Sequence, residues 1–338
     1  MTDNYEEYIS TLSRITNYLS SMPKKEFDLN DICFSDVKIL PKTEQHGKRT
    51  KFEIFDGNYI YKEAKSNTME DYAEVFFYNF LKQLNVECAE YFLCSFKSKK
   101  GVCTRNFIAP NEILLTGTQL IDSYLSYNEI NSQMFDYNLH HDIRLITKYN
   151  NFQDIAIILH KLFDNSKVNI QYIVEELKKI YCIDLLFLQS DRNSSNWGIL
   201  YNLANSSIKL APFYDNSGIF KLNNALQVEN LTNNISKSGV SEIMYQNINL
   251  LRINRSDDIF CSQLSMINKI DDVFILNYLN QLIDKIEEIG LNNIIEKSLV
   301  MSNINSDIFK RIITNNLSIN IDNIKKLINR HQKKLVLY

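Results

Sequence analysis

Glycine and proline are scarce in this sequence, which has 8 glycines and 4 prolines among 338 residues. No G-x-G-x-x-G phosphate loop occurs in it. Its turns must therefore depend on Asn, Asp and Ser, whose side chains also support tight turns and left-handed backbone positions. We expect any motif that normally uses glycine to appear here in reduced form.

Cysteine and histidine spacings typical of metal sites are also absent. The six cysteines are scattered and form no CxxC pair, and the five histidines complete no metal-ligand spacing. In a chain of this length, scattered cysteines indicate free buried thiols rather than a disulfide framework.

The sequence has neither an excess of basic charge nor a long apolar run. Lysine and arginine number 37, aspartate and glutamate 40, and the net charge is −3. A protein that binds nucleic acid without sequence preference needs a basic surface, and a membrane-spanning helix needs about 20 apolar residues. We expect no clear nucleic-acid or membrane binding and a cytoplasmic location. Secretion as an effector stays open, because some export routes leave no visible signal.

The hydrophobic content of 45% is enough for a sizeable core in one large domain or two packed lobes. Apolar residues at helical spacing predict an N-terminal helix over 4–22 and another over 73–86. Alternating patterns predict the strands 37–40, 51–55, 59–65, 89–97 and 101–108. The chain from about residue 124 is mainly helical in pattern, apart from a hairpin formed by 197–203 and 207–215.

Three polar residues surround this hairpin. Asp191 and Asn196, in LQSDRNSSNWGIL, precede its first strand, and Asp215 is expected at the end of its second strand. Antiparallel pairing should bring Asn196 and Asp215 close together. An amide and a carboxylate oxygen suit Mg²⁺, which leaves its other positions to water and phosphate. Asp191 should point into the same cleft, where it could accept a proton from a hydroxyl group.

Transfer of a phosphoryl group also needs a cation near the nucleotide phosphates. Lys62, in the middle of an alternating strand, is the favoured candidate, with Lys65 as the alternative. Glu74, on the helix that follows, is its expected partner, with Glu70 as the alternative. These features follow one another in the order found in protein kinases, which is a strand lysine, a helix glutamate, a D-x-x-x-x-N loop, a hairpin and an aspartate.

In these segments the chain resembles the HipA-like serine/threonine kinases, and in particular their compact single-chain, CtkA-like branch. The specific part is SDRNSSNWG followed by the YD of LAPFYDNSG. The other segments are weaker, and the resemblance spans residues 46–218, about half of the chain. The further segments that carry it are HGKRTKFEI, YIYKEA, AEVFFYNFLKQLNV, GVCTRNF, ILLTGTQLI and IDLLFLQ.

The resemblance implies an α+β, bilobal protein-kinase-like fold, with a small β-rich lobe over 1–123 and a larger helical lobe over 124–338. It also implies roles for the polar residues. Asp191 would be the catalytic base, and Asn196 and Asp215 would be the Mg²⁺ ligands. Lys62 would be the lysine that holds the phosphates, and Glu74 would be the ion-pair partner of Lys62.

Two further segments take expected roles from the same resemblance. Gly47, Lys48 and Arg49 should lie in the loop that covers the nucleotide phosphates, and Leu120–Ser123 should be the hinge that contacts adenine. The sequence departs from ordinary protein kinases at Ser190 and Asn216, and it has no A-P-E segment.

The activity implied is that of an ATP- and Mg²⁺-dependent serine/threonine protein kinase that can phosphorylate itself, as a bacterial toxin or effector. Its expected partners are a protein substrate with a serine or threonine acceptor and an antitoxin. Two alternatives stay open. The reduced glycine loop favours a pseudokinase that binds nucleotide and a partner, and the scaffold also fits a lipid or small-molecule kinase. The lack of a basic amphipathic helix argues against a lipid substrate.

Overall fold

The computed structural model describes residues 37–39, 51–54, 58–65, 67–96, 99–132, 149–163, 168–222, 270–299 and 304–336. The predicted helix at 4–22 and the basic turn with Gly47, Lys48 and Arg49 lie outside these residues.

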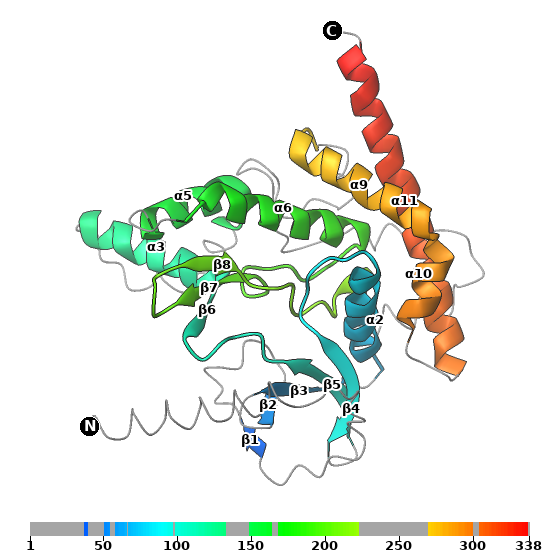
Figure 1. The fold of residues 1–338 in the computed structure, drawn as a ribbon, viewed down its shortest axis with the longest axis horizontal. Coiled ribbons are helices and arrows are strands. Elements are labelled where there is room, and N and C mark those ends of the chain that lie inside the picture. Colours follow the sequence, from blue (N-terminus) through cyan, green and yellow to red (C-terminus); the bar gives the residue numbers. More distant parts are fainter. Residues whose placement is uncertain are drawn as a thin grey trace.

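Strands between residues 37 and 105 form a five-stranded antiparallel sheet (Figure 1) with the order β1-β2-β3-β5-β4. Its strands are β1 (Val37–Ile39), β2 (Lys51–Ile54), β3 (Tyr59–Glu63), β4 (Tyr91–Phe96) and β5 (Lys99–Arg105). β3 forms as the alternating pattern predicted, but burial along it does not alternate, since the neighbouring residues Tyr61 and Lys62 are both buried. β3 is the middle strand of this sheet, so a residue on it is held firmly in place.

Helix α2 (Glu70–Gln83) packs against β4 and β5. Acidic residues in its first turn interact favourably with the positive end of the helix dipole. Its phenylalanines are spaced at i, i+1 and i+4, and they contact Phe187 directly after another helix, α6 (Ile170–Leu186). The ring centroids of Phe77 and Phe80 both lie 5.0 Å from that of Phe187. These rings join α2 to the segment that leads into the predicted catalytic loop.

A second, three-stranded antiparallel sheet has the order β6-β7-β8 (Glu112–Thr116, Gly198–Asn202 and Ile208–Leu210). It contains the predicted hairpin, but β8 ends at Leu210, so the expectation that Asp215 ends this strand is wrong. Pro212 has no N–H to donate to a strand ladder. Beyond it, Phe213 pairs instead with Cys88 in an isolated parallel bridge.

Helices make up most of the remaining described chain. They are α3 (Gly117–Ser132), α5 (Phe152–Phe163), α6, a 3₁₀ turn η2 (Ile219–Lys221), α9 (Val273–Ile289), α10 (Leu291–Ser298) and α11 (Ile304–Val336). Helices α3, α5 and α6 lie over the small sheet, whereas α9, α10 and α11 lie together at the far side of α2 (Figure 1). Two of these helices have a side-chain cap at their N-terminus. The Asn169 side chain accepts a hydrogen bond from Tyr172 N in α6, and the Asp272 side chain accepts one from Ile275 N in α9.

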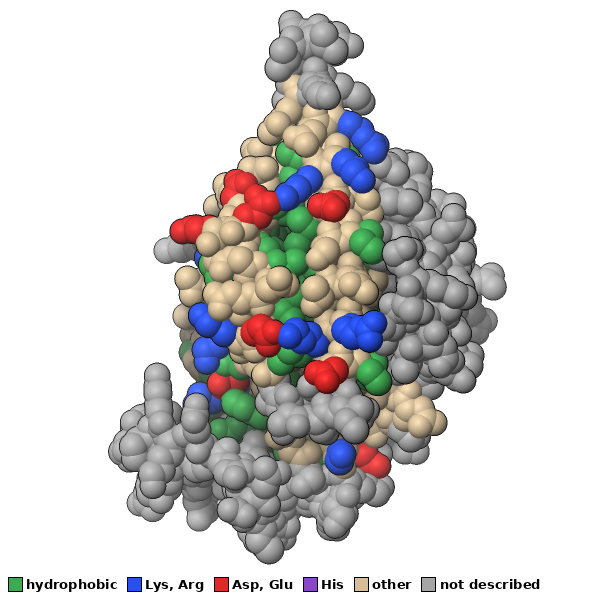
Figure 2. Space-filling model, turned by 90° about the vertical axis from the view of Figure 1, so that its right-hand side faces the viewer, with side chains coloured by type: hydrophobic (Ala, Val, Ile, Leu, Met, Phe, Trp, Pro, Cys, Tyr) green, Lys and Arg blue, Asp and Glu red, His purple; other side chains and the backbone are tan. Residues whose placement is uncertain are grey.

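The outer helices pack along a hydrophobic seam. Figure 2, which views the right-hand side of Figure 1, shows a lengthwise band of hydrophobic side chains with acidic and basic side chains beside it. Ion pairs connect α11 to its neighbours, from Lys310 to Glu296 on α10 and from Lys325 to Glu287 on α9. Such exposed pairs contribute little stability, so the apolar seam holds the helices together.

The described residues therefore form a mixed α+β fold with small sheets and a larger helical part, as the sequence predicted. Within the described part of the chain, no helix is both long enough and apolar enough to cross a membrane. The cysteines at 88, 94, 103 and 182 are free thiols, as predicted, and all of these except the half-buried Cys88 are buried.

Candidate active site

The loop that follows α6 is fixed by the buried guanidinium of Arg192. Its Nε and Nη2 atoms bind the Asp184 carboxylate at 2.9 and 3.1 Å. Nη1 donates to the carbonyls of Asn196 at 2.7 Å and Tyr214 at 2.8 Å, and Nη2 donates to Asn216 Oδ1 at 2.7 Å. One side chain thus ties the 191–196 loop to helix α6 and to the segment around Asp215.

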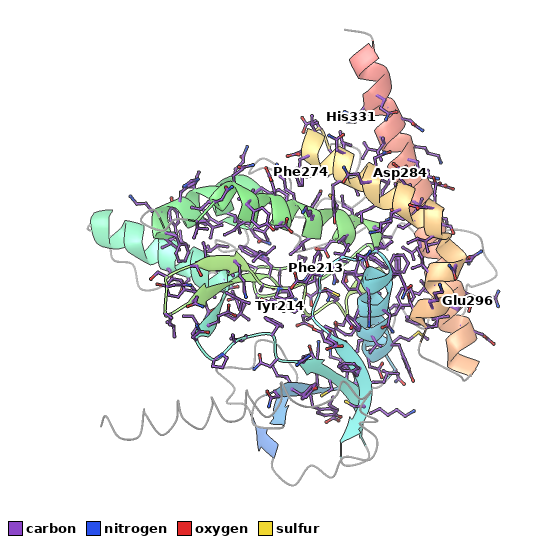
Figure 3. The ribbon with its side chains drawn as sticks, in the orientation of Figure 1. Phe213, Tyr214, Phe274, Asp284, Glu296 and His331 are labelled. Atoms are coloured by element: carbon purple, nitrogen blue, oxygen red, sulfur yellow. The ribbon has the colours of Figure 1, made fainter. Side chains whose placement is uncertain are left out.

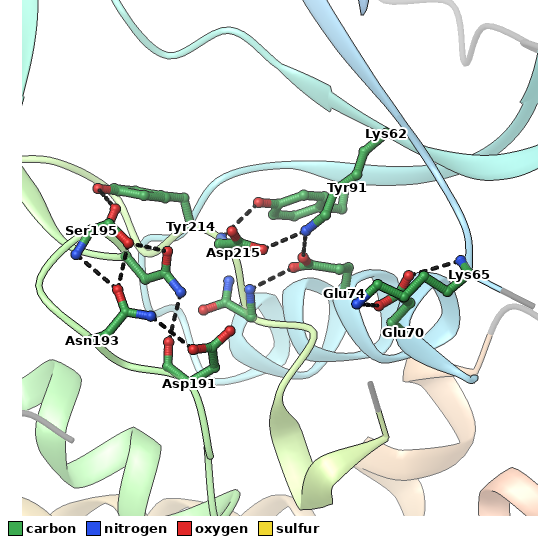
Figure 4. Close-up of polar contacts among 12 residues, drawn as sticks. Lys62, Lys65, Glu70, Glu74, Tyr91, Asp191, Asn193, Ser195, Tyr214 and Asp215 are labelled. Carbon is green, nitrogen blue, oxygen red and sulfur yellow. Dashed lines mark hydrogen bonds and ion pairs between the residues drawn. The ribbon is translucent and has the colours of Figure 1, made fainter. Parts of the chain in front are cut away.

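The Asp191 side chain is oriented by its neighbours in the same loop (Figure 4). Asn193 Nδ2 donates to Asp191 Oδ1 at 2.8 Å, and Asn196 Nδ2 donates to the Asp191 carbonyl at 2.7 Å. Burial raises the pKa of the Asp191 carboxyl, and the negative charge of Asp215 raises it further. Asp191 is therefore a carboxylate with increased basicity, which suits a proton acceptor.

Lys62, Glu74 and Asp215 lie together, although they come from β3, α2 and the segment after β8. Lys62 Nζ donates to Glu74 Oε1 at 3.0 Å and forms a short ion pair with Asp215 Oδ1 (Figure 4). The alternative lysine lies elsewhere, since the Lys65 side chain is 47% exposed and its Nζ lies 3.9 Å from Glu70. The structure brings together the favoured pair, Lys62 and Glu74, and places the alternatives in a separate pair.

Glu74 is fully buried and uses both carboxylate oxygens. Oε1 accepts from Lys62, and Oε2 accepts from the backbone N–H of Asn216 at 2.7 Å. Burial raises the pKa of Glu74, whereas the ammonium of Lys62 opposes this rise. Glu74 therefore connects α2 to the segment that carries Asp215, as well as to the strand lysine.

Asp215 has a left-handed backbone conformation, with φ of 54°. A non-glycine residue in this region costs about 1 kcal/mol or more and persists only where its surroundings hold it. Its N–H donates to the hydroxyl of Tyr91 on β4 at 3.0 Å. Figure 4 shows Tyr91 beside Asp215, on the same side as Lys62.

The polar residues fit a magnesium ion by the chemistry of their oxygen atoms. In the described part of the chain, no three His, Cys, Asp or Glu side chains form a metal-binding group. Mg²⁺ does not need one, because it binds one or two protein oxygens and takes the rest from water and phosphate. The Asp215 carboxylate already accepts a cation, the Lys62 ammonium. The amide oxygen of Asn196 accepts one long hydrogen bond from Ser195 Oγ, at 3.4 Å.

The segment predicted to be the hinge is part of a helix. Leu120–Ser123 lies inside α3, where Leu120 and Ile121 are buried in the core, because the apolar stretch after residue 112 divides into β6 and the start of a helix. The chain passes from the large sheet to the small one through 106–111. In this connection, the Phe107 ring stacks on that of Tyr214 with centroids 5.7 Å apart. Tyr214 lies at the centre of the molecule, where the two sheets and α2 meet (Figure 3).

Several residues of this site were not assigned a role from the sequence. Arg192 and Asn193 lie inside the motif, and their polar side chains next to Asp191 were the available signal. Tyr91 had no such signal, because it lies 124 positions from Asp215 in an ordinary alternating strand.

The sequence matches no protein-family model, and no curated protein matches it. Among solved structures, it is similar to the Helicobacter pylori proinflammatory kinase CtkA, with a TM-score of 0.63 at 17% identity. This match covers 88% of this chain and 98% of CtkA. The chain has the fold of CtkA. The predicted likeness to the HipA-like kinases is thereby confirmed for the fold.

A second similar structure is HipA of Shewanella oneidensis MR-1, which was solved in a complex with HipB and operator DNA. Its TM-score is 0.48 at 12% identity, and the match covers 95% of this chain and 72% of HipA. The likeness to CtkA, in contrast, extends over most of this chain and nearly all of CtkA.

Proposed function

We propose that this chain is an ATP- and Mg²⁺-dependent serine/threonine protein kinase of the HipA-like class. The proposal is supported most strongly by one connected polar network on a CtkA-like fold. In that network Lys62 contacts both Glu74 and Asp215, and Arg192 joins the segment around Asp215 to the loop of Asp191. These contacts hold together the lysine, the glutamate and the two aspartates that phosphotransfer would use.

In this proposal Asp191 accepts the proton of the substrate hydroxyl. That oxygen forms a bond to the γ-phosphorus of ATP while the bond from this phosphorus to the β,γ-bridging oxygen breaks and ADP leaves. Asn193 holds one carboxylate oxygen of Asp191 and so orients the other. General-base assistance of this kind contributes roughly 10² to 10⁴ in rate.

Lys62 would hold the α- and β-phosphates of the nucleotide, and Glu74 would keep its ammonium in position. Asn196 and Asp215 would hold Mg²⁺, which neutralises developing charge on the phosphate oxygens. The short contact between Lys62 and Asp215 supports this assignment, because it shows that the carboxylate faces a cation. We assign the adenine contact to the connection 106–111 in place of Leu120–Ser123.

The roles of Gly47, Lys48 and Arg49 in covering the phosphates stay predictions from the sequence. An antitoxin partner, self-phosphorylation and action as a toxin or effector are likewise predictions from the resemblance.

The two lysines of the β3 region provide a matched test of the nucleotide site. Lys62→Ala should weaken Mg·ATP binding and reduce phosphotransfer by at least about 10²-fold, because a phosphate-binding cation acts in a site screened from water. Lys65→Ala, which removes an exposed lysine three residues away, should leave both unchanged. Calorimetry with Mg·ATP and a phosphotransfer assay measure these effects. Equal results for the two variants would contradict the proposal.

A further inference from the structure

We propose that the hydroxyl group of Tyr91 positions Asp215 for binding Mg²⁺. This inference rests on the proposed function, because it names a residue that acts on the magnesium site through the backbone of a ligand. Tyr91 lies in β4, in a different sheet from the hairpin that leads to Asp215.

The conformation of Asp215 depends on three hydrogen bonds to the two peptide groups that flank this residue. The Tyr214 carbonyl accepts from Arg192 at 2.8 Å, and the Asn216 N–H donates to Glu74 at 2.7 Å. Between them, the Asp215 N–H donates to the Tyr91 hydroxyl at 3.0 Å. Because a left-handed aspartate is strained, these three contacts together select the backbone conformation that aims its carboxylate.

The main chain brings the two segments together before the hydroxyl makes its contact. Cys88 and Phe213 form a parallel bridge, and Ala89 N donates to the Phe213 carbonyl at 2.8 Å. The chain from residue 88 therefore runs beside the chain from residue 213. Tyr91 and Asp215 follow this paired stretch, and their hydrogen bond extends it by a side chain.

The ring of Tyr91 is held in a hydrophobic cluster and cannot move away easily. It is 5% exposed and packs with Val75, Ala89 and Val102. Burial and the nearby carboxylates of Glu74 and Asp215 raise the pKa of its hydroxyl, so it remains a neutral phenol. A neutral phenol oxygen can accept the Asp215 N–H without adding negative charge to the site.

This arrangement has a consequence for the magnesium site. A group that orients a metal ligand through a hydrogen bond affects metal affinity even though it never touches the ion. Without the hydroxyl, the N–H of Asp215 would lose its partner and the backbone could leave the left-handed region. The carboxylate would then spend less time facing the phosphates and the metal.

Tyr91→Phe removes this hydroxyl and retains the ring. The matched control is Tyr78→Phe, since Tyr78 packs against the same hydrophobic cluster and its hydroxyl donates to Glu90 at 3.0 Å, away from Asp215. Phosphotransfer is measured at fixed ATP while free Mg²⁺ is varied. We expect Tyr91→Phe to raise the Mg²⁺ concentration for half-maximal activity about tenfold. Tyr78→Phe should give the wild-type value.

A shift in melting temperature for Tyr91→Phe with an unchanged Mg²⁺ requirement would mean a purely structural role and would overturn the inference. Hydrogen exchange on the ligand-free wild type gives a second test that needs no variant. The Asp215 amide should be protected, and rapid exchange there would overturn the inference even if Tyr91→Phe does not fold.

The same experiment separates this inference from the proposed function. If the wild type binds Mg·ATP without transferring phosphate, the proposed kinase activity fails with the acceptors tested. The role of Tyr91 is then tested by calorimetry, which measures how ATP binding depends on Mg²⁺. We expect Tyr91→Phe to raise the Mg²⁺ concentration for half-maximal ATP binding about tenfold. If the wild type binds no Mg·ATP, both the proposed function and the inference are overturned.

Discussion

Asp191 illustrates how the environment of one residue can change its chemistry. The carboxyl is buried and lies near the negative charge of Asp215, and both effects favour its protonated form. Asn193 opposes them by donating to the carboxylate. The balance is a raised pKa, which makes the carboxylate a better proton acceptor than an exposed aspartate.

The raised pKa predicts the pH dependence of the reaction. Asp191 works as a base only when it is deprotonated, so activity should fall as the pH decreases through its pKa. Because that pKa is raised, the acid limb of kcat/KM for Mg·ATP should lie above the ordinary aspartate value of about 3.9. A pH–rate profile measures this limb. An acid limb at or below the ordinary value would contradict the environment described for Asp191.

At the scale of elements, the long helix α11 supports the base of the active site. Asn320, buried in the middle of α11, donates through Nδ2 to the carbonyls of Leu185 and Leu186 at the end of α6. Helix ends leave carbonyl groups without intrahelical partners, and a side chain from another helix can satisfy them. The loop that carries Asp191, the proposed base, follows the end of α6.

Replacement of Asn320 by alanine tests this support. Asn320→Ala should lower the free energy of unfolding by about 1–3 kcal/mol, because it removes the side-chain donor that two buried carbonyl groups share. Asn315→Ala is the control, since Asn315 is an exposed residue of the same helix and its replacement brings the same change in helix propensity. Chemical denaturation of the two variants measures the difference. Equal stabilities would show that the contact from α11 contributes nothing.

The elements were predicted more successfully than the contacts between them. Alternation identified β2 and β3, and helical spacing identified α2, because both patterns depend on neighbours in the sequence. The run after residue 112 was harder, since a short apolar stretch fits a strand or a buried helix, and here it forms part of each. Hydrogen bonds such as that between Tyr91 and Asp215 join distant segments and leave no local pattern.

At the scale of the whole molecule, side chains from the large sheet and α2 hold the segment that follows the small sheet. Lys62 and Tyr91 contact Asp215, and Glu74 contacts Asn216. The predicted lobe boundary at residue 123 falls within α3, and β6, before it, pairs with β7. We therefore propose that the junction between the lobes is 106–111, which connects the two sheets.

We propose that this network transfers phosphate from ATP to a hydroxyl group. The most direct test of this transfer is incubation of the purified protein with Mg²⁺ and γ-labelled ATP, with and without a mixture of protein acceptors, followed by mass spectrometry. Asp191→Ala serves as the comparison, because it removes the proposed base and leaves Lys62 and Asp215 in place. We expect labelled serine or threonine with the wild type and none with Asp191→Ala, while both bind Mg·ATP. Equal labelling by the two proteins, or none by a wild type that fails to bind Mg·ATP, would contradict the account.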